Sequence, residues 1–166
     1  PSKLLLGRVY LETKNANATI DVIEEAMTFG ADPNLTTILL MKAHMLNRDY
    51  LKVIDQNHDK LNKKNEIELI LLQASALKSL KRFEQSLAKY ELALKFNSNN
   101  IEVISGLAYF FLQQQELDKV NSLVTQLLSI DPQAARTIHL QGLVFQKENK
   151  IEKALYAFEK AYQKDV

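Results

Sequence analysis

Apolar residues recur three and four positions apart along most of this chain. Clear runs are Ile101, Ile104, Leu107, Ala108 and Phe111, and later Ala154, Ala157, Phe158 and Ala161. This spacing places apolar side chains on one face of an α-helix, and no comparable stretch alternates with a period of two. The pattern therefore predicts amphipathic helices and no β-sheet.

Short polar breaks separate the predicted helices. They fall at 15–18, 30–34, 47–49, 62–65, 80–82, 97–100, 114–116, 131–133 and 148–150. About ten helices of roughly 11 to 14 residues fit between these breaks, which is close to the usual helix length. The chain has only four Gly and three Pro and is rich in good helix formers. The predicted fold class is all-α.

The predicted helices repeat in pairs. Segments 67–100, 101–134 and 135–166 align without gaps at a period of 34 residues, and 1–33 and 34–66 continue the series backwards, with the second one residue short. Small residues coincide at Ala74, Ala108 and Gly142, and large ones at Leu77, Phe111 and Phe145. Segment 34–66 diverges most, because its second helix ends in the polar run 56–60.

Each recurring residue type has a steric reason. Small residues are expected where the two helices of a repeat cross, because a bulky side chain would push their axes beyond the usual distance of about 8–10 Å. These are Gly7, Ala74, Ala108 and Gly142 on first helices, and Ser86, Ala93, Ala154 and Ala161 on second helices. Aromatic residues such as Tyr10, Tyr90 and Phe158 are expected to fill the spaces between repeats.

A 34-residue period with small and aromatic residues at these offsets resembles the tetratricopeptide repeat (TPR). Leu6, Gly7 and Tyr10 fall on that family's Leu-Gly-x-x-Tyr signature, and Ala26 on its late alanine. The resemblance covers the whole chain. It implies an α-α superhelix, or solenoid, of about five helix-turn-helix repeats forming a single domain, 1–166, and a protein-interaction scaffold that binds a partner's peptide or helix in a concave groove.

The resemblance also implies which side chains line the groove, because the family's groove positions carry over residue by residue. The polar and anchoring positions are Arg8, Glu12, Lys42, Met45, Ser75, Lys78, Tyr109, Gln113, Arg136, His139 and Gln146. Further positions are Leu4, Leu11, Ile38, Leu46, Leu71, Ser105, Leu112 and Leu143. Such a lining suits a peptide with apolar anchors and a few carboxylates.

Tyr109 is the strongest single anchor candidate, because a tyrosine on a rigid helix offers a large contact area with little rotamer entropy to lose. The alternative is that Tyr109 only packs against the neighbouring repeat. The TPR subclass that grips chaperone tails uses paired Lys and Asn, whereas this chain has Leu71 and Ser75, or Leu4 and Arg8, at those positions. This difference argues against chaperone-tail binding.

A finer resemblance concerns 4–10, 24–34 and 39–52, which are similar to the TPR lipoproteins of bacterial PEP-CTERM/exosortase systems. That family is associated with exopolysaccharide production and is exported. The resemblance implies a periplasmic or outer-membrane-anchored protein, and without it the expectation is cytoplasmic. The sequence contains neither a lipidated cysteine nor a sorting motif.

Charge and composition exclude several partners. The chain has 21 basic and 20 acidic residues, a net charge of +1, so it has no strongly basic balance of the kind that nucleic-acid binders show. We expect no nucleic-acid partner. No apolar run approaches the roughly 20 residues of a membrane span, so no transmembrane segment is expected. Pro1 is not followed by a targeting leader, and we interpret the chain as part of a longer protein.

Catalytic and metal sites are not expected. His44, His58 and His139 fall in separate repeats, and no phosphate-binding loop, nucleophile elbow or His-Glu-x-x-His motif occurs. Each histidine is interpreted as solvated or at the edge of the core. The sequence therefore predicts a non-enzyme without catalytic residues, cofactor or metal, and an enzyme or small-ligand-binding protein is the least favoured alternative.

Self-association is the other alternative. Each repeat buries its apolar face on the next, so end repeats need a polar cap. The last helix is of ordinary repeat type, and Leu155, Tyr156 and Tyr162 are expected to be partly exposed. The sequence therefore predicts a weak homodimer through the terminal repeats.

Overall fold

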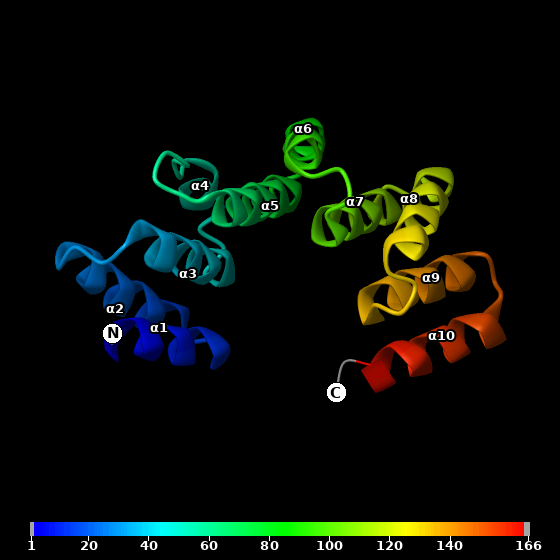
Figure 1. Ribbon diagram of the computed structural model, residues 1–166, viewed down its shortest axis with the longest axis horizontal. Helices are drawn as coiled ribbons and strands as arrows, with labels where there is room; N and C mark the ends of the chain where they lie inside the picture. Colours follow the sequence, from blue (N-terminus) through cyan, green and yellow to red (C-terminus); the bar gives the residue numbers. More distant parts are fainter. Residues whose placement is uncertain (1, 165–166) are drawn as a thin grey trace. The chain divides into compact units, whose positions relative to one another are not determined.

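The computed structural model describes residues 2–164, which form ten α-helices and contain no β-strand (Figure 1). The helices are α1 (Ser2–Glu12), α2 (Ala16–Thr28), α3 (Pro33–Leu46), α4 (Tyr50–Ile54), α5 (Lys63–Ser79), α6 (Phe83–Phe96), α7 (Ile101–Gln113), α8 (Leu117–Ile130), α9 (Ala135–Lys147) and α10 (Ile151–Lys164). The predicted all-α class is confirmed.

Successive helices pair into antiparallel hairpins, and the chain forms two compact units. In unit 1, which contains α1 to α6, α1 packs on α2, α3 packs on both of them, and α5 packs on α3, α4 and α6. In unit 2, which contains α7 to α10, α7 packs on α8, and α9 packs on α7, α8 and α10. Within each unit, every new first helix therefore rests on the hairpin before it.

The turn inside each hairpin repeats the same backbone conformation. Lys14, Arg48, Lys81, Gln115 and Asn149 all have a positive φ, between 57° and 62°. After each of them, a backbone N–H donates to a carbonyl five residues earlier, as Arg82 does to Leu77 at 2.9 Å and Lys150 to Phe145 at 2.9 Å. This closure satisfies carbonyls at the end of the first helix. The five turns thus confirm the repeat at the level of the backbone.

These left-handed residues give a first prediction. The conformation costs a non-glycine residue roughly 1–2 kcal/mol, which glycine avoids. Glycine also loses more backbone entropy on folding, which offsets about 0.5–1 kcal/mol of this gain. Gln115→Gly should therefore stabilise unit 2 by up to about 1 kcal/mol in urea unfolding. Ser122→Gly, at an exposed position within α8, is the matched control and should destabilise it instead.

Small residues do let the paired helices approach closely. A Cβ atom added to Gly142 would lie 2.6 Å from Phe158 Cε1, and one added to Gly7 would lie 2.6 Å from Ile23 Cδ1. Ala74 and Ala108, at the same register, are fully buried. Ser86 adds a buried hydrogen bond, because its Oγ donates to the carbonyl of Ala74 at 2.8 Å. The predicted crossing points are confirmed.

The expected helix lengths are wrong in the second repeat. α4 has five residues and α5 has 17, instead of the roughly 11 to 14 expected. The polar run 56–60 has no apolar face with which to continue α4. At the end of α4, Gln73 Nε2 instead donates a hydrogen bond to the carbonyl of Ile54 at 3.1 Å. α5 begins early because Asn62 Oδ1 accepts from the Asn65 N–H at 3.0 Å.

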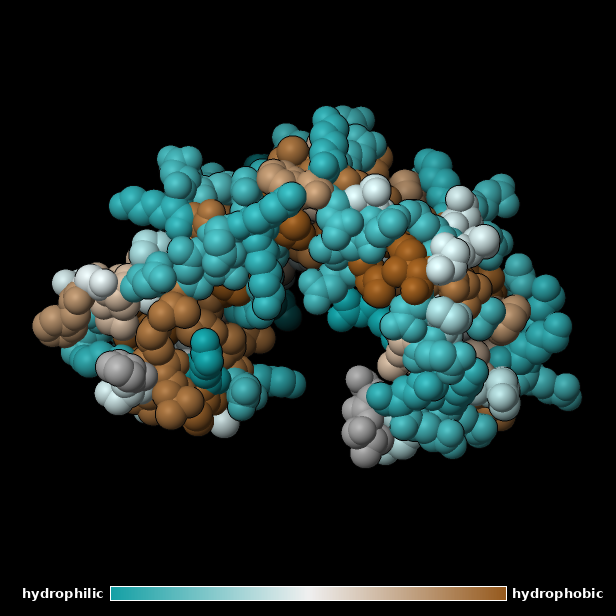
Figure 2. All heavy atoms as spheres, in the orientation of Figure 1, coloured by the Kyte–Doolittle hydropathy of each residue, from teal (hydrophilic) through white to brown (hydrophobic). Residues whose placement is uncertain are grey.

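Apolar side chains remain exposed on the first and last hairpins. Leu155, Tyr156 and Tyr162 of α10 are exposed, as predicted, and so are Leu5 and Val9 of α1. Figure 2 shows hydrophobic surface over α1.

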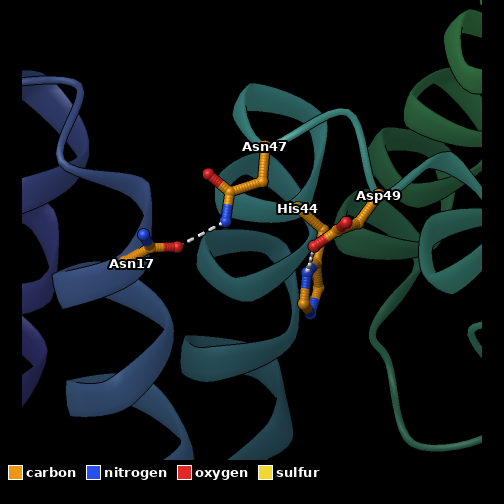
Figure 3. A network of polar contacts seen from close by, with 4 residues as sticks. All are labelled: Asn17, His44, Asn47 and Asp49. Atoms are coloured by element: carbon orange, nitrogen blue, oxygen red, sulfur yellow. Dashed lines mark hydrogen bonds and ion pairs between the residues drawn. The ribbon is translucent and has the colours of Figure 1, made fainter.

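His44 is buried more deeply than a core-edge histidine. It occupies the register at which Phe111 and Phe145 stand in later repeats, and its Nδ1 lies 3.2 Å from Asp49 Oδ2 (Figure 3). Beside it, Asn47 Nδ2 donates to Asn17 Oδ1 at 2.7 Å, joining α2 to the end of α3. A polar ring is accommodated there because a carboxylate is in hydrogen-bonding range.

Candidate functional site

Three of the predicted groove residues come together in unit 2. Tyr109 of α7 and Arg136 and His139 of α9 line one hollow of about 420 Å³. Its remaining lining is Ala135 of α9 with Phe158, Ala161 and Tyr162 of α10. Three helices thus supply the walls, and α9 packs on both of the others.

Aromatic rings form a continuous row across this hollow. The hydroxyl oxygen of Tyr109 lies 2.8 Å from His139 Nδ1, and the two ring centroids are 6.1 Å apart. The His139 ring in turn lies 5.4 Å from that of Phe158 at a tilt of 46°. With the proton of His139 on Nε2, Nδ1 accepts the Tyr109 hydroxyl proton. The row joins α7, α9 and α10. Tyr109 therefore both packs on the next repeat and lines the hollow.

The hollow carries a positive charge at its mouth. Burial raises the pKa of Tyr109, and the neighbouring Arg136 guanidinium partly opposes that rise. Arg136 is exposed, and none of the ion pairs within residues 2–164 involves it. A carboxylate entering the hollow would therefore meet a guanidinium that no acidic side chain in the described part of the chain already pairs with.

Two further predicted residues of unit 2 lie outside this hollow. Gln113 is one helical turn beyond Tyr109 on α7, and Gln146 lies in the last turn of α9. Both side chains are exposed. They can contact a ligand that extends along the first helices, but they do not line the hollow itself.

The predicted residues of unit 1 are mostly engaged inside the unit. Arg8 and Glu12 are exposed on α1. Lys42 Nζ lies 2.6 Å from Glu68 Oε1 and so joins α3 to α5, and Met45 packs against the apolar cluster formed by α2 to α5. An ammonium that is already paired offers less to an incoming carboxylate than Arg136 does.

Ser75 and Lys78 are also partly withdrawn from solvent. A side-chain hydrogen bond joins Ser75 to Tyr90, and burial lowers the pKa of Lys78. Ile38 and Ser105, expected in the groove, are buried. Ile38 belongs to the apolar cluster of unit 1, which corrects its assignment to a binding surface.

The structure adds Phe158, Ala161 and Tyr162 to the site. Carrying over groove positions considers only the first helix of each repeat, whereas these three belong to the second helix of the last repeat. An aromatic pair four residues apart, Phe158 and Tyr162, was the available signal in the sequence.

Within residues 2–164, no group of three or more His, Asp or Glu side chains could hold a metal ion. Among the helices of the same residues, none is long and apolar enough to span a membrane.

Comparison with known proteins identifies the fold. Neither a protein-family model nor a curated protein matches the chain. Among solved structures, it is similar to TTC0263, a thermophilic TPR protein in Thermus thermophilus, with a TM-score of 0.74, 14% identity and coverage of 98% of this chain and 90% of that one.

Two other similar structures are MamA and YrrB. For MamA the TM-score is 0.61 at 17% identity, covering 96% of this chain and 94% of that one. For YrrB, a TPR protein with an unusual peptide-binding site, the TM-score is 0.55 at 14% identity, covering 97% and 84%. The finer resemblance to PEP-CTERM lipoproteins gains no support from these likenesses. What they do show is that this chain has the all-α helix-turn-helix repeat fold of TPR proteins.

Proposed function

We propose that this chain is a protein-interaction module without catalytic activity, which binds a peptide or helix of a partner protein along its first helices. The observation that carries the proposal is the unit 2 hollow, where a row of aromatic rings adjoins a guanidinium that forms no ion pair with any residue in 2–164. Rigid aromatic and arginine side chains in preformed pockets dominate binding energy at protein interfaces. That YrrB is described as having a peptide-binding site is consistent with this function.

The ligand that fits best carries an aromatic or aliphatic side chain next to a carboxylate. The apolar group would stack on His139 and Phe158, and the carboxylate would accept from the Arg136 guanidinium. The walls come from two repeats, so both an extended peptide and one face of a helix could enter. The proposed partner is a protein, and not nucleic acid, because the chain's net charge is only +1.

We expect Tyr109→Ala to weaken peptide binding by at least tenfold, about 1.4 kcal/mol, because it removes the ring that begins the aromatic row. Tyr109→Phe keeps the ring and loses only the hydrogen bond to His139, so its effect should be smaller. The measurement is binding to an array of peptides in which an aromatic residue adjoins Asp or Glu, compared with the same peptides carrying Asn or Gln.

Arg136→Ala should abolish the preference for the acidic peptides while leaving residual binding to the neutral set. Lys42→Ala should have the weaker effect, because Glu68 already pairs with Lys42. Thr125→Ala, on the exposed side of α8, is the control and should bind as the unchanged chain does. Equal binding by the folded Tyr109→Ala variant would show that the hollow is not the site.

The cellular setting is a separate proposal, drawn from the finer resemblance. If the chain works in an exported polysaccharide or secretion system, capture that depends on Tyr109 should recover components of that machinery. Tyr109-dependent capture of cytosolic chaperones would reject that setting and leave the interaction function standing.

A further inference from the structure

The shortened α4 leaves a hollow of about 300 Å³ in unit 1. The second helices of the later repeats, α6, α8 and α10, each have 14 residues, whereas α4 ends after five (Figure 1). The hollow is lined by Met27 at the end of α2, Pro33 and Thr37 of α3, and Leu61 with four polar residues of the loop after α4. The preceding and the following repeat are both present in unit 1, so this hollow is not an end face of the repeat array.

Thr37 stands at a register that the later repeats fill with isoleucine. The equivalent residues of α5, α7 and α9, all buried, are Ile70, Ile104 and Ile138. In the last repeat, Ile138 packs against Ala157 and Ala161 from the second half of α10. α4 ends before the equivalent positions, and loop residues line the hollow beside Thr37 instead. A threonine thus replaces isoleucine in the repeat whose second helix is shortened.

The hydroxyl of Thr37 has no partner in the described part of the chain. Thr37 is only 5% exposed, and its side chain makes no hydrogen bond with any group in residues 2–164. The neighbouring Thr36, by contrast, donates from its hydroxyl to the carbonyl of Asp32 at 3.2 Å. A nearly buried hydroxyl without a hydrogen bond costs free energy, and isoleucine at the same place would avoid that cost. The hydroxyl therefore points to a polar group that enters the hollow.

The rest of the lining defines the chemistry of such a ligand. Met27, Pro33 and Leu61 are apolar, and a methionine thioether packs favourably against an aromatic ring. The charged lining residues, Asp59 and Lys60, are exposed and of opposite sign, so charge complementarity favours a neutral ligand. A volume of about 300 Å³ lies at the lower end of the range for small-ligand sites. The hollow thus suits a single group of about the size of one ring.

We propose that this hollow binds a phenol, a neutral ring that carries one hydroxyl group. The ring packs against Met27, Pro33 and Leu61, and its hydroxyl forms a hydrogen bond with Thr37 Oγ1, which can both donate and accept. A free small molecule and the tyrosine side chain of a partner protein present this same chemistry. The hollow shares no residue with the Tyr109 site, so this inference does not depend on the proposed function of that site.

Titration of the 166-residue chain with p-cresol, the side chain of tyrosine, tests the site. In methyl NMR spectra, the signals of Met27, Thr37 and Leu61 should shift and saturate, because these residues line the hollow. The signal of Met45, which packs against the apolar cluster of unit 1 and not in the hollow, should stay unchanged. Toluene has the same ring and methyl group but no hydroxyl, so it should bind at least tenfold more weakly.

Substitutions of Thr37 separate the hydroxyl from the shape of the hollow. Thr37→Val removes the hydroxyl and should bind p-cresol no more tightly than toluene, whereas Thr37→Ser keeps the hydroxyl and should keep the preference for p-cresol. Thr125→Val, at an exposed position of α8, is the matched control and should bind both compounds as the unchanged chain does. Circular dichroism checks that each variant is folded, and the comparison of p-cresol with toluene on the unchanged chain needs no variant.

The tripeptide acetyl-Ala-Tyr-Ala-amide distinguishes the two sources of the phenol. Binding of this peptide at least as tightly as p-cresol would identify a partner's tyrosine as the ligand, and binding of p-cresol alone would identify a free small molecule. Three results would overturn the proposal. They are the absence of saturable shifts with both p-cresol and the tripeptide, equal affinity of the unchanged chain for p-cresol and toluene, and a folded Thr37→Val variant that still prefers p-cresol.

Discussion

Gly142→Leu is expected to destabilise unit 2 by about 3 kcal/mol or more while leaving the stability of unit 1 unchanged. A Cβ at this position would already lie 2.6 Å from Phe158 Cε1, 2.8 Å from Phe158 Cδ1 and 3.2 Å from Ala157 Cβ. Ala157 is buried on α10, so the helix backbone, and not only a flexible side-chain end, would have to move. Overpacking of this kind costs about 1–3 kcal/mol and sometimes more, and a unit of this size is stable by only roughly 4–10 kcal/mol.

Urea unfolding followed by circular dichroism measures the effect, which should reach about 3 kcal/mol or more. Ser122→Leu introduces the same side chain at an exposed position of α8 in the same unit and should change stability by less than about 0.5 kcal/mol. Adding Phe158→Ala to Gly142→Leu should recover part of the loss, because it removes the ring that the leucine meets. Additive losses from these two substitutions would mean that the clash is not the cause.

The repeat fold could be predicted because its determinants are local and periodic. Small residues such as Ala74 and Gly142 recur at a constant register, and their role depends only on the helix that follows. The left-handed turn residues could not be predicted, since Lys14, Lys81 and Gln115 carry no residue preference for that conformation. At these positions the hairpin closure overrides the intrinsic preference.

The site could be predicted only in part, for a related reason. The family register identified Tyr109, Arg136 and His139, but the ring contact that extends this row to Phe158 depends on the packing of α9 on α7 and α10. Ion pairing was also invisible in the sequence. Lys42 and Arg136 are both groove cations by register, and only the structure shows that Glu68 pairs with Lys42.

Gln73→Leu should destabilise unit 1 by about 3 kcal/mol, because Gln73 connects the shortened α4 to α5 and α6. Its side chain is 1% exposed, and its Nε2 donates to the carbonyls of Val53 at 3.3 Å, Ile54 at 3.1 Å and Gln56 at 3.0 Å. Its Oε1 accepts from Lys89 Nζ at 2.6 Å and lies 3.2 Å from His58 Nε2. Leucine fills a similar volume and removes every one of these bonds.

The loss falls on groups that solvent reaches poorly. Burial already lowers the pKa of Lys89, so its ammonium would lose its acceptor at a partly buried position. Urea unfolding measures stability, and hydrogen exchange of residues 50–62 should accelerate, because the end of α4 and the following loop lose their donor. Gln85→Leu, exposed on α6 of the same unit, is the matched control and should leave both measurements unchanged.

An opposite result for Gln73→Leu is also interpretable. Replacing a buried polar group by an apolar one of similar shape can be neutral or stabilising when its partners find water. If stability is kept and exchange of residues 50–62 stays slow, the loop is held instead by Asn34, whose Oδ1 accepts from the Asn62 N–H at 2.7 Å and whose carbonyl accepts from Asn65 Nδ2 at 2.7 Å. Asn34→Ala would then release the loop, so the two substitutions together identify which contact replaces the missing turns of α4.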